Sequence, residues 1–161
     1  MGILQRFTDI MSANINSLLS NAEEKNAGKL LEKYLADARA NLEELKAETS
    51  AIIADEMAAG RRVTANNEEI AKFDRYAEQA VMAGNDDDAR KFLDAKAKLT
   101  AKKQDLENAY ELAKANSDKM RQMTRKLMDD ISAAEGKMGE LRAKLTVAEN
   151  KEKMDDLMHK V

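Results

Sequence analysis

The first two dozen residues alternate between apolar and polar positions with the period of an α-helix. Placed at 100° per residue, the apolar side chains lie on one arc, while the opposite arc is polar. This apolar stripe comprises Ile3, Leu4, Phe7, Ile10, Met11, Ile15, Leu18 and Leu19. The pattern predicts an amphipathic helix as the first structural unit, residues 1–22.

A coiled-coil pattern follows, from about Lys29 to Met82, after a polar junction predicted at residues 26–28. Apolar residues recur at alternating spacings of three and four, so one face of the helix would meet a partner helix. We call these positions the seam; they are Leu31, Leu35, Ala38, Leu42, Leu45, Ile52, Ala59, Val63, Ile70, Phe73, Ala77 and Ala80. Polar residues interrupt the seam at Thr49, Glu56 and Asn66, and Gly60 weakens the helix near its middle.

The clearest break in the chain lies near residues 83–88. Gly84 can adopt the left-handed conformation that ends a helix, and Asn85 or Asp86 can cap the next one. Because the link is short, the two helices must lie antiparallel. The predicted fold is therefore all-α, with the amphipathic helix followed by a long antiparallel coiled-coil hairpin over residues 24–161.

The second arm of the hairpin has its seam at strict intervals of seven residues, followed by a shift of four. The seam positions are Leu99, Leu106, Ala113, Met120 and Leu127, then Ile131, Ala134, Met138, Leu141 and Leu145. Such a shift locally unwinds a coiled coil, and two glycines follow it. The pattern therefore predicts an elbow near residues 134–139.

The composition supports long helices and offers no catalytic site. Charged residues make up 35% of the 161 residues and aromatics 4%, and the chain contains no Pro, Cys or Trp. No phosphate-binding, dinucleotide-binding or metalloprotease motif is present, and His159 has no evident partner. The Asp86–Asp88 run lacks the ligand spacing of a calcium loop and is better explained as helix capping. We expect no enzyme activity, no metal and no cofactor.

The charge distribution argues against nucleic acid as a partner. The net charge is −3, with acidic and basic residues interleaved. A basic stretch after the turn has no interleaved aromatic residues for stacking on bases, so it is better explained as a solvated face or a contact between subunits. It comprises Arg90, Lys91, Lys96, Lys98, Lys102 and Lys103.

The apolar stripe must be shielded from water, and its pattern is compatible with two different contact surfaces. It can lie at the headgroup boundary of a membrane, or it can pack on its own hairpin or a neighbouring subunit. No apolar run approaches the roughly 20 residues that span a bilayer, so a membrane would be met peripherally. Arg6 and Asp9 cancel on the polar side. Membrane binding would therefore depend strongly on curvature and weakly on salt.

The run MGILQRFTDIMSANINSLLSNAEE resembles the N-terminus of the phage-shock protein A family. This family includes the vesicle-inducing protein in plastids and belongs to the bacterial branch of the ESCRT-III superfamily. The family pattern is matched at Met1, Gly2, Ile3, Arg6, Phe7, Asp9, Ile10, Ala13, Asn14, Ile15, Asn16, Leu18, Leu19, Ala22 and Glu23. The run Lys91-Phe92-Leu93 after the turn also resembles the family's helix restart.

The resemblance implies a cytoplasmic protein that is recruited to the inner membrane under envelope stress. It implies a lipid-binding first helix, and polymers that stabilise or remodel curved or stressed bilayers. Family members commonly have Asp-Pro where this chain has Glu24-Lys25, and they usually continue into further helices, one of which locks neighbouring hairpins together. The alternative function is a soluble coiled-coil adaptor that sequesters a regulatory protein, such as a transcriptional activator.

Overall fold

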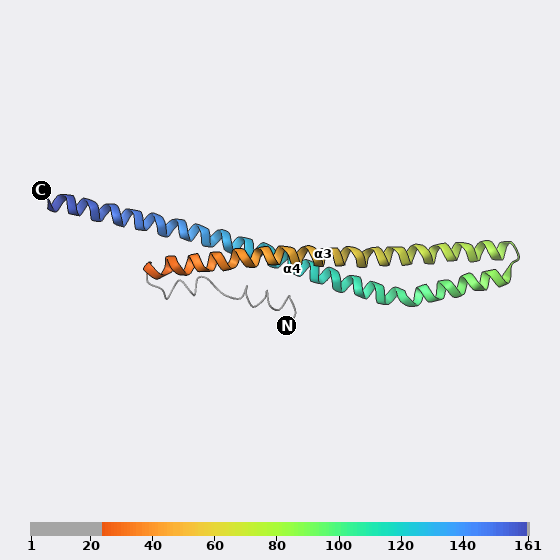
Figure 1. Ribbon diagram of the computed structural model, residues 1–161. Coiled ribbons are helices and arrows are strands. Elements are labelled where there is room, and N and C mark those ends of the chain that lie inside the picture. The colour runs from red at the N-terminus through yellow and green to blue at the C-terminus, as the bar shows by residue number, and fades with distance from the viewer. Residues whose placement is uncertain (1–23, 161) are drawn as a thin grey trace. The chain divides into compact units, whose positions relative to one another are not determined.

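The structure is a computed structural model that describes residues 24–160. Two helices account for nearly all of them, α3 (Glu24–Met82) and α4 (Asp86–His159), and no strand occurs between residues 24 and 160 (Figure 1). The helices are antiparallel, which confirms the predicted all-α hairpin. The amphipathic helix predicted at residues 1–22 lies outside the described part of the chain.

The start of α3 differs from the prediction. Residues 26–28 were expected to form a polar junction, but they lie inside the helix, which begins at Glu24. Gly28 costs the helix about 1 kcal/mol relative to alanine. Burial of Ala27 and Leu31 on either side offsets that cost, so the helix continues through the glycine.

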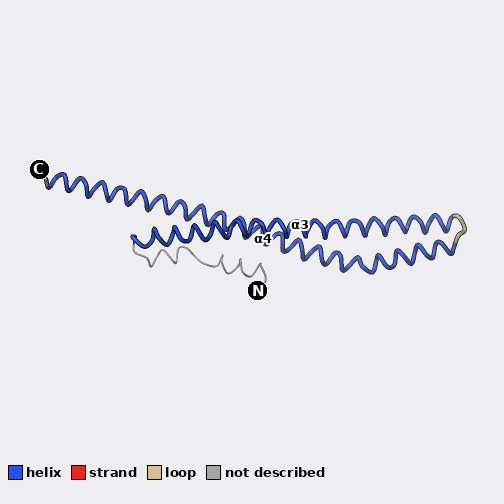
Figure 2. Tube along the Cα trace, in the orientation of Figure 1, coloured by secondary structure: helices blue, strands red, loops and turns tan. Residues whose placement is uncertain are grey.

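The end of α3 is set by backbone hydrogen bonds around Gly84, which has a φ of +75°. The Asn85 N–H donates to the Ala80 carbonyl at 2.8 Å, and the Gly84 N–H donates to the Val81 carbonyl at 3.1 Å. This pair of bonds forms a Schellman motif, which satisfies carbonyls that the helix end would otherwise leave without partners. The connection is therefore confined to the three residues 83–85 (Figure 2).

The start of α4 is capped by Asn85. Its side-chain Oδ1 accepts a hydrogen bond from the Asp88 N–H at 3.4 Å, and its Nδ2 donates to the Asp88 carboxylate at 2.6 Å. The carboxylates of Asp86, Asp87 and Asp88 all lie in the first turn of α4, where the positive end of the helix dipole favours them.

The later part of α4 is continuous where the sequence predicts an elbow. Residues 134–139 are helical throughout, and a Cβ placed on Gly136 or Gly139 would have nothing within 4 Å. The elbow itself stays a prediction. Beyond the seam residue Leu141, every described residue from 142 to 160 is exposed.

The hairpin divides into two units, each built from a part of both helices. Unit 1 has described residues 24–47 and 121–160, and unit 2 has residues 48–120. The buried residues of unit 1 are Ala27, Leu31, Leu35, Ala38, Leu45, Met123, Leu127, Ile131, Ala134 and Met138. Those of unit 2 are Thr49, Ala59, Asn66, Ala77, Ala80, Ala89, Ser117 and Met120. Most are seam positions predicted from the heptad pattern.

Candidate functional site

The eight residues of the apolar stripe, Ile3 to Leu19, precede Glu24 and lie outside the described residues. Their role as a membrane-binding site therefore stays a prediction. Of the predicted site residues, Gly84, Asn85 and Asp86 are described: Gly84 ends α3, Asn85 caps α4 and Asp86 begins it. They belong to the end of the hairpin, residues 73–96, which we call the tip.

Three aromatic rings from both helices meet in the tip. The ring centroids of Tyr76 and Phe92 lie 5.4 Å apart, and the centroid of Phe73 lies 6.2 Å from each of them. Aromatic pairs at such distances contribute about 0.5–1.5 kcal/mol beyond the area that they bury. The Lys72 Nζ lies over the Tyr76 ring, 5.7 Å from its centroid. The cluster therefore ties α3 to α4 close to the turn.

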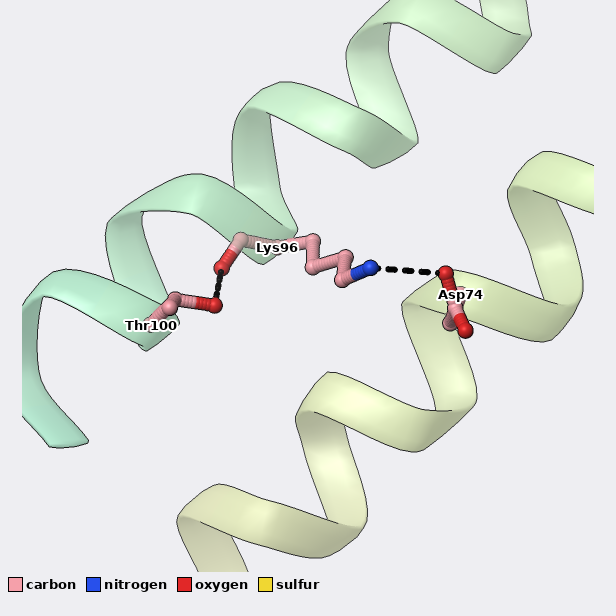
Figure 3. Close-up of polar contacts among 3 residues, drawn as sticks. All are labelled: Asp74, Lys96 and Thr100. Atoms are coloured by element: carbon pink, nitrogen blue, oxygen red, sulfur yellow. Dashed lines mark hydrogen bonds and ion pairs between the residues drawn. The ribbon is translucent and has the colours of Figure 1, made fainter.

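An ion pair joins the two helices beside this cluster. The Lys96 Nζ lies 2.8 Å from the Asp74 Oδ1, and the Thr100 hydroxyl donates to the Lys96 carbonyl at 2.8 Å (Figure 3). Both partners of the ion pair are partly exposed, so water screens it and it contributes at most about 1 kcal/mol. Its main effect is to set where the two helices meet.

The tip also exposes large apolar side chains. Met82, the last residue of α3, is 89% exposed, and Val81 before it is 59% exposed. Tyr76 and Leu93 are exposed as well, although less fully. Single exposed apolar residues are common on protein surfaces, so their exposure does not by itself define a binding site.

The charged groups of the tip lie in solvent or pair locally. Arg90 lies 3.9 Å from Asp87, and the basic stretch from Arg90 to Lys103 is exposed apart from Lys96. Within residues 24–160, no group of three or more His, Asp or Glu side chains could hold a metal ion. None of the helices in this described part is long and apolar enough to cross a membrane.

Sequence reasoning missed contacts that depend on the opposite helix. Tyr76 was not singled out, and neither was the pairing of Asp74 with Lys96. The sequence also did not indicate that Gly60 faces α4, where a Cβ would lie 3.3 Å from the Tyr110 ring. The missed signal is that three of the chain's six Phe and Tyr residues flank the turn.

Unit 1 has its own contacts between the helices. Arg39 and Glu135 form an exposed ion pair at 2.8 Å. Burial raises the pKa of the Tyr34 hydroxyl, and the negative charge of Asp130 raises this pKa further.

The sequence profile of the PspA/IM30 family matches residues 2–161. This chain belongs to the PspA/IM30 family. The match begins before the described residues and includes the apolar stripe, so the resemblance in the first two dozen residues is confirmed at the level of the family.

Curated relatives agree with this assignment. A phage shock protein A homolog of Bacillus subtilis is 41% identical over 157 residues, which cover 98% of this chain and 68% of the relative. The membrane-associated protein Vipp1 of Synechocystis is 30% identical over 144 residues, or 89% of this chain and 51% of the relative. A phage shock protein A homolog of Deinococcus radiodurans is 26% identical over 157 residues. The chain thus spans between half and about two thirds of the length of the first two relatives.

Proposed function

We propose that this PspA/IM30-family chain is a peripheral membrane scaffold without catalytic activity of its own. It assembles with copies of itself on the cytoplasmic side of the inner membrane, and it stabilises or remodels curved or stressed bilayers during envelope stress. The observation that carries the proposal is the apolar stripe of residues 3–19. The family assignment supports it, as does the name of the Synechocystis relative, a membrane-associated protein.

The stripe has enough apolar surface to hold the chain at a bilayer. Each Leu, Ile, Phe or Met side chain contributes about 1.5–3 kcal/mol when fully buried. Half-burial of eight such side chains would contribute about 6–12 kcal/mol to binding at the bilayer surface. Because the charges of Arg6 and Asp9 nearly cancel, apolar burial rather than attraction to anionic lipid drives the binding.

The proposed self-assembly is supported by the small number of side chains that the hairpin buries. Each helix of a two-helix hairpin packs one seam and leaves its other faces to solvent. The last turns of α4 expose Leu145, Val147, Met154, Leu157 and Met158. Packing against further copies would cover such side chains and stabilise an arm that is thin for its length.

Vesicle flotation tests the proposal with matched variants of the stripe. Phe7→Asp places a charge on the apolar arc, and Ser12→Asp places the same charge on the polar arc. We expect the unaltered chain and Ser12→Asp to float with small anionic vesicles, whereas Phe7→Asp and a chain without residues 1–22 stay at the bottom.

Circular dichroism should show the same helical hairpin in all the point variants. Equal flotation of Phe7→Asp and the unaltered chain would contradict the membrane proposal. Loss of binding in moderate salt would contradict the proposed dominance of apolar burial.

The adaptor function remains the second candidate because the tip exposes Val81, Met82 and Leu93. In that case the first helix would be buried with a protein partner, and Phe7→Asp would reduce partner binding or solubility. A large soluble assembly that never floats, with or without residues 1–22, would favour the adaptor over the scaffold.

A further inference from the structure

The middle of unit 2 has little apolar packing. Its seam residues Val63, Ile70, Leu99 and Leu106 are only half-buried, while the polar Asn66 between them is buried, with 7% exposure. In Figure 1, the part of α4 that belongs to unit 2 curves away from α3 after the turn and then returns toward it. Polar contacts therefore connect the helices where the apolar contacts are weakest.

One of these contacts reaches the backbone of α4. The Asn66 Nδ2 donates a hydrogen bond to the Leu99 carbonyl oxygen at 3.0 Å. In an α-helix this carbonyl also accepts the N–H of the residue four positions later, which is Lys103. Two donors thus share one carbonyl, which weakens the bond that this carbonyl makes within the helix.

A second side chain acts on the same stretch of α4 from within the helix. The Thr100 Oγ1 donates to the Lys96 carbonyl at 2.8 Å, the carbonyl to which the Thr100 N–H is directed (Figure 3). Hydrogen bonds from threonine to the carbonyl four residues earlier often bend helices. Two side-chain donors therefore act on carbonyls only three residues apart, and side chains inserted into the helical ladder are a known cause of kinks.

The stretch is fixed on both sides. Toward the tip, Lys96 pairs with Asp74 and Phe92 packs with Phe73 and Tyr76. On the other side, the Tyr110 ring lies against Gly60, in an open surface groove that Met57 and Thr64 also line. Bending of α4 should therefore concentrate between these two fixed points.

We propose that residues 96–103 of α4 form a bending point that lets the tip tilt within unit 2. The Asn66 amide and the Thr100 hydroxyl create it by sharing carbonyls with the helix's own N–H donors. This inference goes beyond the scaffold function and does not depend on lipid binding. It concerns the hairpin alone, so it can hold or fail whether or not the chain floats with vesicles.

Distances between spin labels test the bending point. Because the chain has no cysteine, labels can be attached to cysteines introduced at Glu69 on α3 and Asp105 on α4, which are both exposed. Thr100→Val removes the hydroxyl and keeps the branched shape. Thr146→Val is the matched control, because Thr146 donates in the same way to the Arg142 carbonyl, at 2.9 Å, in unit 1.

We expect a broad label-to-label distance distribution in the unaltered full chain, diluted with unlabelled protein so that distances between copies do not contribute. Thr100→Val should narrow the distribution and shift it to shorter distances, and Thr146→Val should leave it unchanged. Identical distributions in the three proteins would overturn the proposal.

Hydrogen exchange supplies a second measurement. The amides of Thr100 and Lys103 should exchange about tenfold faster than the amides of the neighbouring turns of α4, because their acceptor carbonyls are shared. Uniform protection of α4 from residue 92 to residue 117 would also overturn the proposal.

Discussion

The two units share the same pair of helices, but they are stabilised differently. Unit 1 buries large aliphatic side chains, with Leu31 and Leu45 fully inaccessible and Leu127 and Ile131 nearly so. Most of the seam residues that unit 2 buries are alanine or polar. Since a buried leucine contributes about 1.5–3 kcal/mol and a methyl group about 0.8, unit 1 should hold most of the packing energy.

In unit 2, a few specific contacts between the helices take the place of extensive apolar packing. The aromatic cluster, the Asp74–Lys96 pair and the bond from Asn66 to the Leu99 carbonyl each need a particular geometry. Such contacts specify where the helices meet, although each contributes little net stability. A regular heptad pattern therefore does not imply that the two helices are held together equally well along their length. Local separation of the helices should be easier in unit 2.

The largest expected effect comes from truncating a seam leucine in each unit. Leu31→Ala in unit 1 should lower the free energy of unfolding by about 3 kcal/mol, because it leaves a cavity at a fully buried site. Leu106→Ala in unit 2 should cost about 1 kcal/mol, since that side chain is only half-buried. Urea unfolding followed by circular dichroism measures both changes, and equal costs would break the comparison between the units.

Replacement of a glycine by alanine should change the stability in opposite directions in the two units. Gly84→Ala in unit 2 should cost about 1–2 kcal/mol, because the residue has a φ of +75°. Gly136→Ala in unit 1 should stabilise the chain by up to about 1 kcal/mol, since a Cβ meets nothing there and alanine favours the helix. The melting temperatures of the two variants check these signs. A loss of stability in Gly136→Ala would show that the glycine has a role the hairpin alone does not explain.

Removal of the buried Ser117 hydroxyl should have a smaller effect in unit 2, and it should stabilise the fold. The residue is fully buried, and its Oγ has no hydrogen-bond partner. Ser117→Ala should therefore raise the free energy of unfolding by about 1 kcal/mol. Ser132→Ala, at an exposed position of α4, is the matched control and should change it by no more than a few tenths of a kcal/mol. Urea titrations of both variants measure the difference, and a destabilised Ser117→Ala would mean that the hydroxyl binds a group in solution.

The smallest expected effect is on the pH dependence of stability, through Tyr34 in unit 1. Burial and the neighbouring Asp130 raise the pKa of Tyr34, so the folded state favours the neutral phenol. The resulting stability is fully present below the unfolded pKa, about 10, and is lost as pH rises through the folded pKa. Tyr34→Phe should remove this contribution to the loss of stability at alkaline pH. Between about pH 8 and about pH 11, the difference in free energy of unfolding between the two proteins should therefore shift in favour of Tyr34→Phe. A difference that stays constant over that range would contradict the assignment.

The candidate sites were predictable to different degrees. The turn residues could be identified because glycine, asparagine and aspartate have strong local preferences at helix ends. The aromatic cluster could not, because Phe73, Tyr76 and Phe92 come from two helices and meet only in the folded hairpin. The assignment of Ile3 to Leu19 as membrane-binding residues rests on helical periodicity and on the family resemblance, and it stays a prediction.

The sequence by itself determined the elements of this protein. Helical periodicity, seam spacing and the glycine at the turn are local properties of the chain, and together they specify two antiparallel helices. Only the tertiary structure decided where α3 begins and which polar seam residues find partners. The Asn66 side chain donates to a carbonyl of α4, whereas the buried Ser117 hydroxyl has no hydrogen-bond partner. The physical reason is that a hydrogen bond across two helices depends on their register and separation, which no single stretch of sequence contains.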